Sequence, residues 1–150
     1  MLNRLLVEKL DEKAKLPERA HGTDAGYDLF SCEEIHIQPG ETRLVNTGVA
    51  IKMERQDDIS EDRAVYVGLL WDRSSLGSKG IHRFGGVIDE GYRGPIKVAM
   101  HNSTDKMYSV YVGAKIAQLL LQKAYIPPVE EVDHLDETER GDAGFGSTGA

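Results

Sequence analysis

The sequence predicts one domain of mainly β structure, arranged as a sandwich or barrel. Its 150 residues suit a single compact unit with a normal hydrophobic core. Short β-like runs are separated by Gly, Pro, Asn or Asp, which is the spacing expected of such folds. No segment carries the pattern of a long amphipathic helix. A hydrophobic content of 40% with 29% charged residues is ordinary for a globular chain.

Six apolar runs are the expected strands. In chain order they are Leu5 to Leu10, Arg43 to Met53, Ala64 to Trp71, Pro95 to His101, Met107 to Val112 and Lys115 to Ile126. The fifth run contains MYSVYV, whose alternation indicates a strand with one solvent-facing side. The sixth contains IAQLLLQ, which is more continuous, so its length permits either a buried strand or a helix.

Three other segments have a distinct character. DRSSLGSKG is expected to contain one short helix with Ser74 or Ser75 at its N-cap. The segment from Glu54 to Arg63 is highly charged, and we expect a solvated hairpin loop there. The last segment, ERGDAGFGSTGA, has almost nothing to bury, so it is expected to be mobile when no ligand is bound.

Charge and cysteine content exclude several classes of protein. The chain has 25 acidic and 18 basic residues and a net charge of -7, which argues against broad binding to nucleic acid. Cys32 is the single cysteine, so no intramolecular disulfide can form. The start lacks a signal-peptide core, and nowhere do about 18 apolar residues run together. We therefore expect a cytoplasmic protein without a membrane partner.

Several short stretches contain residues suited to chemistry on an anionic ligand. In GGVIDEGYRG, Asp89 follows two apolar residues and is either a general base or the cap of a turn. In DAGYDL, Asp28 could act through a hard cation such as Mg²⁺. In DRSSLG, Arg73 could bind an anion with its planar guanidinium, aided by the Ser74 hydroxyl.

Two other interpretations of site residues are not supported by the sequence. The terminal GFGSTG lacks the lysine of a Walker phosphate loop and has no room for the helix that follows such a loop. The five histidines show no paired ligand spacing, so a zinc site is not expected. The five are His21, His36, His82, His101 and His134.

Taken in order, five stretches resemble the five motifs of the homotrimeric dUTP diphosphatases, the dUTPases. They are AGYDL, RSSLG, GVIDEGYRG, GAKIAQLLL and RGDAGFGSTG, and together they cover nearly the whole chain. The resemblance implies a jelly-roll-like β-barrel over residues 1–139 and a flexible C-terminal lid over 140–150. It also implies a homotrimer with shared active sites that hydrolyses dUTP to dUMP and pyrophosphate. Such an enzyme limits uracil incorporation into DNA and supplies dUMP for dTMP synthesis.

The resemblance also assigns roles at the reacting end of the substrate. Asp89 matches the acid that activates the water attacking the α-phosphorus. Tyr92 matches the ring that packs against deoxyribose and leaves no space for a 2′-hydroxyl. Main-chain groups of a hairpin running through Gly86, Val87 and Ile88 to Asp89 would read uracil.

The phosphate contacts follow from the other motifs. Asp28 matches the acid that holds waters of a Mg²⁺ ion bound to all three phosphates. The matching phosphate-binding residues are Arg73, Ser74, Ser75 and Gln118. Within the C-terminal lid the matching substrate-binding residues are Arg140, Phe145, Gly146, Ser147 and Thr148. Phe145 would stack on uracil, and Arg140, Ser147 and Thr148 would lie near the γ-phosphate. One subunit would supply the first, second and fourth motifs, a neighbour the third, and the third chain its tail.

The chain departs from the family pattern at four positions. Ala114 stands where the family usually has Asp, Ala143 where it often has Gly, and Ser75 where Gly is commoner. Arg83 stands where some relatives have an Asn that contacts uracil, so that contact is not carried over.

Two alternatives remain open from the sequence. The first is a dCTP deaminase, a related fold that needs a Glu and an Arg where this chain has Ala99 and Ser78. The second is a catalytically silent nucleotide-binding regulator that keeps the fold.

Overall fold

The computed structural model of the protein describes residues 2–56 and 63–142, and this part of the chain is nearly all β. Its strands are β1 Leu2–Lys9, β2 Tyr27–Phe30, β3 Ile35–Ile37, β4 Thr42–Asn46, β5 Val49–Arg55, β6 Ala64–Trp71, β7 Ile81–Phe84, β8 Val87–Asp89, β9 Lys97–Asn102, β10 Tyr108–Val110 and β11 Lys115–Tyr125. One short helix, α2, spans Ser74–Gly77. The prediction of an all-β fold is confirmed.

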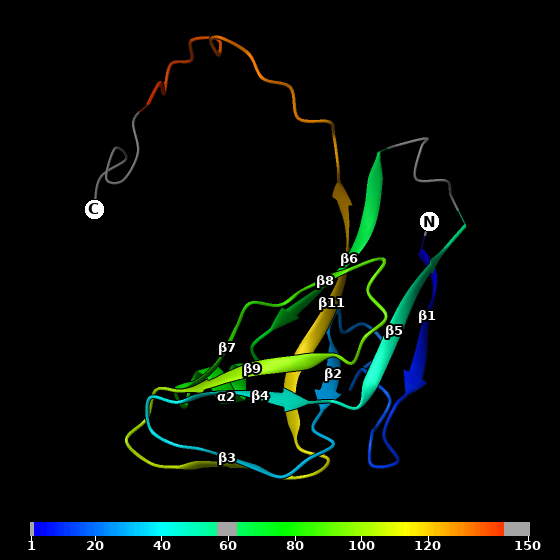
Figure 1. The fold of residues 1–150 in the computed structure, drawn as a ribbon, viewed down its shortest axis with the longest axis vertical. Coiled ribbons are helices and arrows are strands. Elements are labelled where there is room, and N and C mark those ends of the chain that lie inside the picture. The colour runs from blue at the N-terminus through cyan, green and yellow to red at the C-terminus, as the bar shows by residue number, and fades with distance from the viewer. Residues whose placement is uncertain (1, 57–62, 143–150) are drawn as a thin grey trace.

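The strands form antiparallel sheets that enclose one main core (Figure 1). The largest sheet has the order β2-β11-β6-β8, and a second has the order β4-β9-β7. Two further pairs, β1 with β5 and β10 with β3, complete the described arrangement. Leu29 and Leu119 from the first sheet pack with Val45, Val98 and Met100 from the second, so burial of these apolar side chains joins the two sheets.

The run from Arg43 to Met53 does not form one strand, contrary to the sequence-based expectation. It divides at Thr47 and Gly48 into β4 and β5, which pair with β9 and β1 respectively. Gly48 has a φ of 68°, and an added Cβ would lie 2.9 Å from the Cβ atoms of Ala14 and Asp11. The chain therefore changes sheets at a position that requires glycine.

Other strand predictions hold with small changes in their ends. The bounds expected for Ala64–Trp71 are those of β6. The ambiguous last run is a strand, β11, because it pairs with β6 along eight residues and with β2 on its other edge. β2, β3, β7 and β8 were not among the six predicted runs, since strands of three or four residues carry too little periodic pattern.

The expected short helix is present, but its predicted cap is wrong. Arg73, not Ser74 or Ser75, occupies the N-cap, and no side chain caps the first turn. The expected hairpin loop is also shorter at its start, because β5 continues to Arg55. Residues 57–62 of that loop lie outside the described residues.

The chain leaves the sheets after β11. All residues from 126 to 142 are exposed, and Figure 1 shows them running away from the sheets as an arm. Within the described part of the chain, no helix has both the length and the apolar character needed to cross a membrane.

Asn102 is a fully buried polar residue that organises the end of β9. Its Nδ2 donates to the carbonyls of Ile37 and Lys106 at 2.9 and 2.7 Å, and its Oδ1 accepts from both the amide and the hydroxyl of Thr104. One side chain thus joins β3 to the loop after β9 and satisfies the buried carbonyl of Ile37.

We expect Asn102→Ala to lower the free energy of unfolding by roughly 2–4 kcal/mol, because buried carbonyls would lose their donors. Urea denaturation at one fixed protein concentration would measure the change. Asp105→Ala, at an exposed position of the same loop, serves as the control and should stay within about 0.5 kcal/mol of the parent. Equal values for the two variants would contradict this role of Asn102.

Candidate functional site

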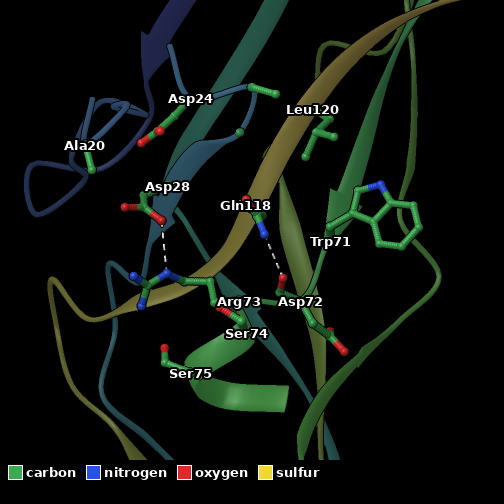
Figure 2. Close-up of a pocket in the computed structure, with 12 residues that line it drawn as sticks. Ala20, Asp24, Asp28, Trp71, Asp72, Arg73, Ser74, Ser75, Gln118 and Leu120 are labelled. Carbon is green, nitrogen blue, oxygen red and sulfur yellow. Dashed lines mark hydrogen bonds and ion pairs between the residues drawn. The ribbon is translucent and has the colours of Figure 1, made fainter. Parts of the chain in front are cut away.

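Strand register brings three of the predicted motifs together. Gln118 on β11 lies opposite Asp28 on β2 and, on the other edge, opposite Trp71 on β6. Arg73 follows two residues after Trp71, at the start of α2. A cavity of about 460 Å³ opens beside this row (Figure 2). Its lining consists of Ala20, Asp24, Ala25, Gly26, Asp28, Trp71, Asp72, Arg73, Ser74, Ser75, Gln118 and Leu120, and we call it the phosphate cavity below.

Asp28 lies between two cationic side chains in this cavity wall. Its Oδ1 accepts from Nε of Arg73 at 3.0 Å, and its Oδ2 lies 2.7 Å from Nζ of Lys115. Asp28 is only 14% exposed, so these ion pairs are less screened than surface pairs. The carboxylate therefore fixes the guanidinium of Arg73 at the cavity wall (Figure 2).

Lys115 was not predicted as a site residue. It belongs to the fourth motif, but its contact with Asp28 depends on the antiparallel register of β11 with β2, where Lys115 lies opposite Phe30. Nothing in the spacing of the sequence indicates that register.

Gln118 is held by a main-chain contact and by a neighbouring glycine. Its Nε2 donates to the carbonyl of Asp72 at 2.8 Å, as Figure 2 shows. A Cβ on Gly26 would overlap Oε1 of Gln118, so glycine is required for this side chain to keep its place. Both hydroxyl residues predicted for the site, Ser74 and Ser75, are exposed at the cavity rim.

Tyr108 has a phenol close enough to Arg73 to be influenced by its charge. Burial raises the pKa of its phenol, and the nearby positive charge of Arg73 lowers it in part. The net direction is upward, so the phenol stays protonated at neutral pH.

The third motif lines a separate cavity of about 400 Å³. The lining residues are Val87, Ile88, Asp89, Tyr92, Pro95 and Lys97, and we call this space the aspartate cavity. Asp89 is exposed at the end of β8, and Tyr92 donates its hydroxyl to the carbonyl of Pro95 at 3.1 Å. Lys97 was missed by sequence reasoning, because only the course of the chain after Pro95 brings it to this cavity.

In β8, Val87 is 65% exposed and only Ile88 faces the core. One expectation about this motif was wrong. The segment is not a hairpin, because β8 pairs with β6 whereas β7 pairs with β9. The motif instead crosses from one sheet to the other.

The structure does not bring Asp89 together with the phosphate cavity of its own chain. Asp89 lies opposite Val67 on one edge of β6, whereas Gln118 lies opposite Trp71 on the other edge. The four-residue offset along β6 corresponds to roughly 13 Å, to which the width of the sheet is added. The two cavities are therefore separate within one chain.

Gly86 stands between the two sheets. Its φ is 121°, its carbonyl accepts the amide of Leu70 at 2.8 Å, and a Cβ would lie 2.7 Å from the Cβ of Leu70. A small cavity of about 120 Å³ adjoins it, lined by Leu69, Leu70, Trp71, Arg83, Gly85, Gly86 and Val87. Glycine allows the backbone to approach β6 closely here.

The C-terminal predictions are only partly covered by the structure. Arg140 lies on the exposed arm. Phe145, Gly146, Ser147 and Thr148 lie outside the described residues.

The donor set fits a hydrated Mg²⁺ rather than a protein-caged ion. In the described residues no group of three or more His, Cys, Asp or Glu side chains converges on one point. The phosphate cavity offers the carboxylate of Asp28 and the amide oxygen of Gln118, and Mg²⁺ is commonly held by one or two carboxylates, waters and substrate phosphates.

Comparison with known proteins gives a consistent result. A family model described as dUTPase matches residues 12–149. The deoxyuridine 5'-triphosphate nucleotidohydrolase of Vaccinia virus (strain Copenhagen) is 43% identical over 141 residues, which cover 94% of this chain and 90% of that protein. The protein of the same name from Clostridium novyi (strain NT) is 43% identical over 149 residues, covering 97% and 99%.

Solved structures agree with this result. The Staphylococcus bacteriophage 80alpha dUTPase with dUpNHpp is similar with a TM-score of 0.86 and 32% identity, covering 99% of both chains. A mutant dUTPase from phage phi11 of S. aureus, described as coordinating a structural Mg(II) ion, has a TM-score of 0.78 and 30% identity over 90% of this chain and 100% of that one. The trimeric jelly-roll type is consistent with these neighbours, and the chain belongs to the dUTPase family.

Proposed function

We propose that this member of the dUTPase family hydrolyses dUTP to dUMP and pyrophosphate at active sites shared between three copies of the chain. The names of the curated relatives support this substrate, and the phage 80alpha dUTPase has been solved with dUpNHpp. The observation that carries the proposal is the division of the motifs between two cavities. A phosphate cavity of one subunit completed by the aspartate cavity of another would contain every group that the reaction needs.

In the proposed site, the phosphate cavity binds the triphosphate. Arg73 presents its guanidinium to the phosphate oxygens, in the orientation that Asp28 fixes at 3.0 Å. Ser74, Ser75 and Gln118 supply neutral donors around the same cavity. When bound, Mg²⁺ would neutralise phosphate charge and fix the triphosphate conformation, with Asp28 contacting it through water.

The aspartate cavity carries the chemical step. Asp89 accepts a proton from a water molecule as that water forms a bond to the α-phosphorus, and the bond from phosphorus to the bridging oxygen breaks to release pyrophosphate. Tyr92 packs against the deoxyribose. Main-chain groups of Gly86 to Asp89 pair with the edge of uracil. Lys97, which lines the same cavity, adds positive charge beside the leaving phosphates.

The exposed arm is the proposed source of the lid. Its residues 126–142 are exposed on their own chain, which suits a segment that reaches another subunit. Residues 140–150 would then close over bound dUTP, with Phe145 on the base and Arg140, Ser147 and Thr148 near the γ-phosphate. The barrel domain would comprise residues 1–139. In the cell, the reaction would limit the incorporation of uracil into DNA and supply dUMP for dTMP synthesis.

A nucleotide panel tests the proposal. Purified protein with Mg²⁺ should release pyrophosphate from dUTP and far less from dTTP, dCTP or UTP, while light scattering should give three times the chain mass. Ammonia released from dCTP would indicate a deaminase instead. Tight dUTP binding without turnover would indicate a silent nucleotide-binding protein.

Asp89→Asn should lower kcat by ~10²–10⁴-fold, because the amide cannot accept the proton of the attacking water. Affinity for dUpNHpp, measured by titration calorimetry, should stay within a few-fold. The exposed Asp105→Asn is the matched control and should leave both quantities unchanged. An Asp89→Asn enzyme with normal kcat would show that another group activates the water.

Gly26→Ala should raise KM for dUTP by about tenfold, because the new Cβ displaces the side chain of Gln118 from the phosphate cavity. Steady-state kinetics with dUTP would measure this change in KM. Gly22→Ala is a close control, since a Cβ there meets nothing within 4 Å. If both variants had the same KM, Gln118 would not be a phosphate ligand.

A further inference from the structure

We propose that Asp72 and Arg83 act together as positioning residues for base recognition by this enzyme. We call this pair the strut. It braces the turn at Gly85 and Gly86 against the end of β6, and so fixes the main-chain groups that pair with the pyrimidine base. The inference rests on the proposed function, because it concerns the base end of the same substrate.

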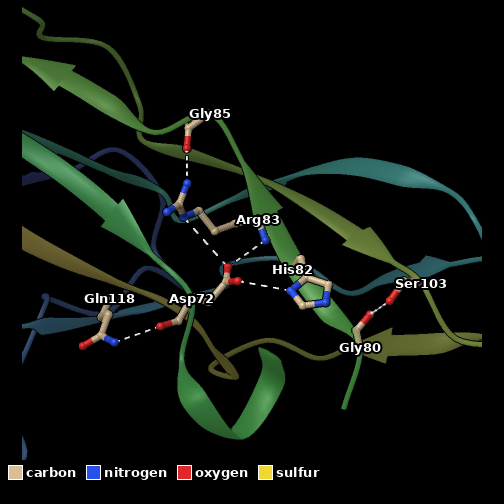
Figure 3. A network of polar contacts seen from close by, with 7 residues as sticks. All are labelled: Asp72, Gly80, His82, Arg83, Gly85, Ser103 and Gln118. Carbon is tan, nitrogen blue, oxygen red and sulfur yellow. Dashed lines mark hydrogen bonds and ion pairs between the residues drawn. The ribbon is translucent and has the colours of Figure 1, made fainter. Parts of the chain in front are cut away.

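Asp72 anchors one end of the strut (Figure 3). Its Oδ1 accepts the main-chain N–H of Arg83 at 2.8 Å and lies 3.9 Å from Nε of the same residue. Its Oδ2 lies 3.2 Å from Nδ1 of His82. Its main-chain carbonyl accepts from Gln118 at 2.8 Å. The position of Asp72 is therefore fixed from β7 and from β11, elements of different sheets.

Arg83 forms the other end. Its guanidinium donates to the carbonyl of Gly85 at 2.6 Å, as Figure 3 shows, and stacks over the ring of Trp71 with 5.3 Å between Cζ and the ring centroid. Its side chain is 22% exposed. A planar guanidinium can make these contacts at once, whereas an ammonium group cannot.

The turn at Gly85 and Gly86 needs such support. Both residues have left-handed φ values, 70° and 121°, and two successive glycines leave a backbone with many accessible conformations. β7 and β8 pair with strands of different sheets, so no ladder between them fixes the turn. Among the described contacts, the amide of Leu70 on the Gly86 carbonyl and the guanidinium on the Gly85 carbonyl hold it.

Arg83 acts on the turn rather than on the base itself. Here its guanidinium is directed at Gly85 and Trp71, so its effect on the base passes through the main chain of the turn. The 120 Å³ cavity beside this turn is lined by Arg83 together with Gly86 and Val87, which are proposed base-reading residues.

The experiment compares Asp72→Asn, Arg83→Gln and the double variant. Each single variant should raise KM for dUTP about tenfold, with a smaller change in kcat and little change in the inhibition constant of dCTP. The KM of the double variant should be no higher than that of the more impaired single variant, because both substitutions remove the same interaction. Arg43→Gln, which removes an exposed arginine ion-paired with Glu41 at 3.2 Å, is the control and should match the parent.

Amide hydrogen exchange gives a readout that does not require turnover. Exchange at residues 85–88 should become faster in both single variants and stay unchanged in Arg43→Gln, while thermal unfolding verifies that each variant is folded. Faster exchange with an unchanged KM, or additive effects in the double variant, would overturn the proposal. A parent protein that fails to hydrolyse dUTP would overturn the proposed function instead, and the exchange rates would still decide whether the strut exists.

Discussion

The antiparallel register of β11 between β2 and β6 is the constraint on which the phosphate cavity depends. It places Asp28, Gln118 and Trp71 in one row across three strands. A shift of one residue would turn Gln118 to the opposite face of the sheet and bury a polar group in the core. Ala117 and Leu119, on either side of Gln118, are buried in the core, whereas Gln118 is only partly buried. The same register therefore packs the core and places Gln118 at the cavity.

Two basic side chains lie at the phosphate cavity or beside it, although the chain as a whole is acidic. The net charge is -7, yet the phosphate cavity contains Arg73 supported by Asp28, with Lys115 on the other carboxylate oxygen. An acidic surface repels polyanions such as nucleic acids. Because Asp24, Asp28 and Asp72 line the phosphate cavity beside Arg73, a bound triphosphate would need a cation as well as this arginine to compensate its charge.

Much of the fold and several of the residues that line the two cavities could be predicted from the sequence, whereas the geometry of the cavities could not. Ala64–Trp71 was predicted to the residue because seven of its eight positions are apolar, which outweighs any competing signal. The break at Gly48 was missed, since the residues on both sides favour strands and only tertiary crowding requires the turn. The distance between Asp89 and Gln118 follows from strand register across β6, which no local pattern encodes. The Asp72 and Lys115 contacts were missed for the same reason.

Trp71 gives the molecule a built-in optical probe. It is the single tryptophan of the chain, it is 50% exposed, and it lies against the guanidinium of Arg83 at the wall of the phosphate cavity. Its emission therefore comes from the junction of the two sheets and from nowhere else. Intrinsic tryptophan fluorescence can therefore follow events at that junction in the unlabelled protein.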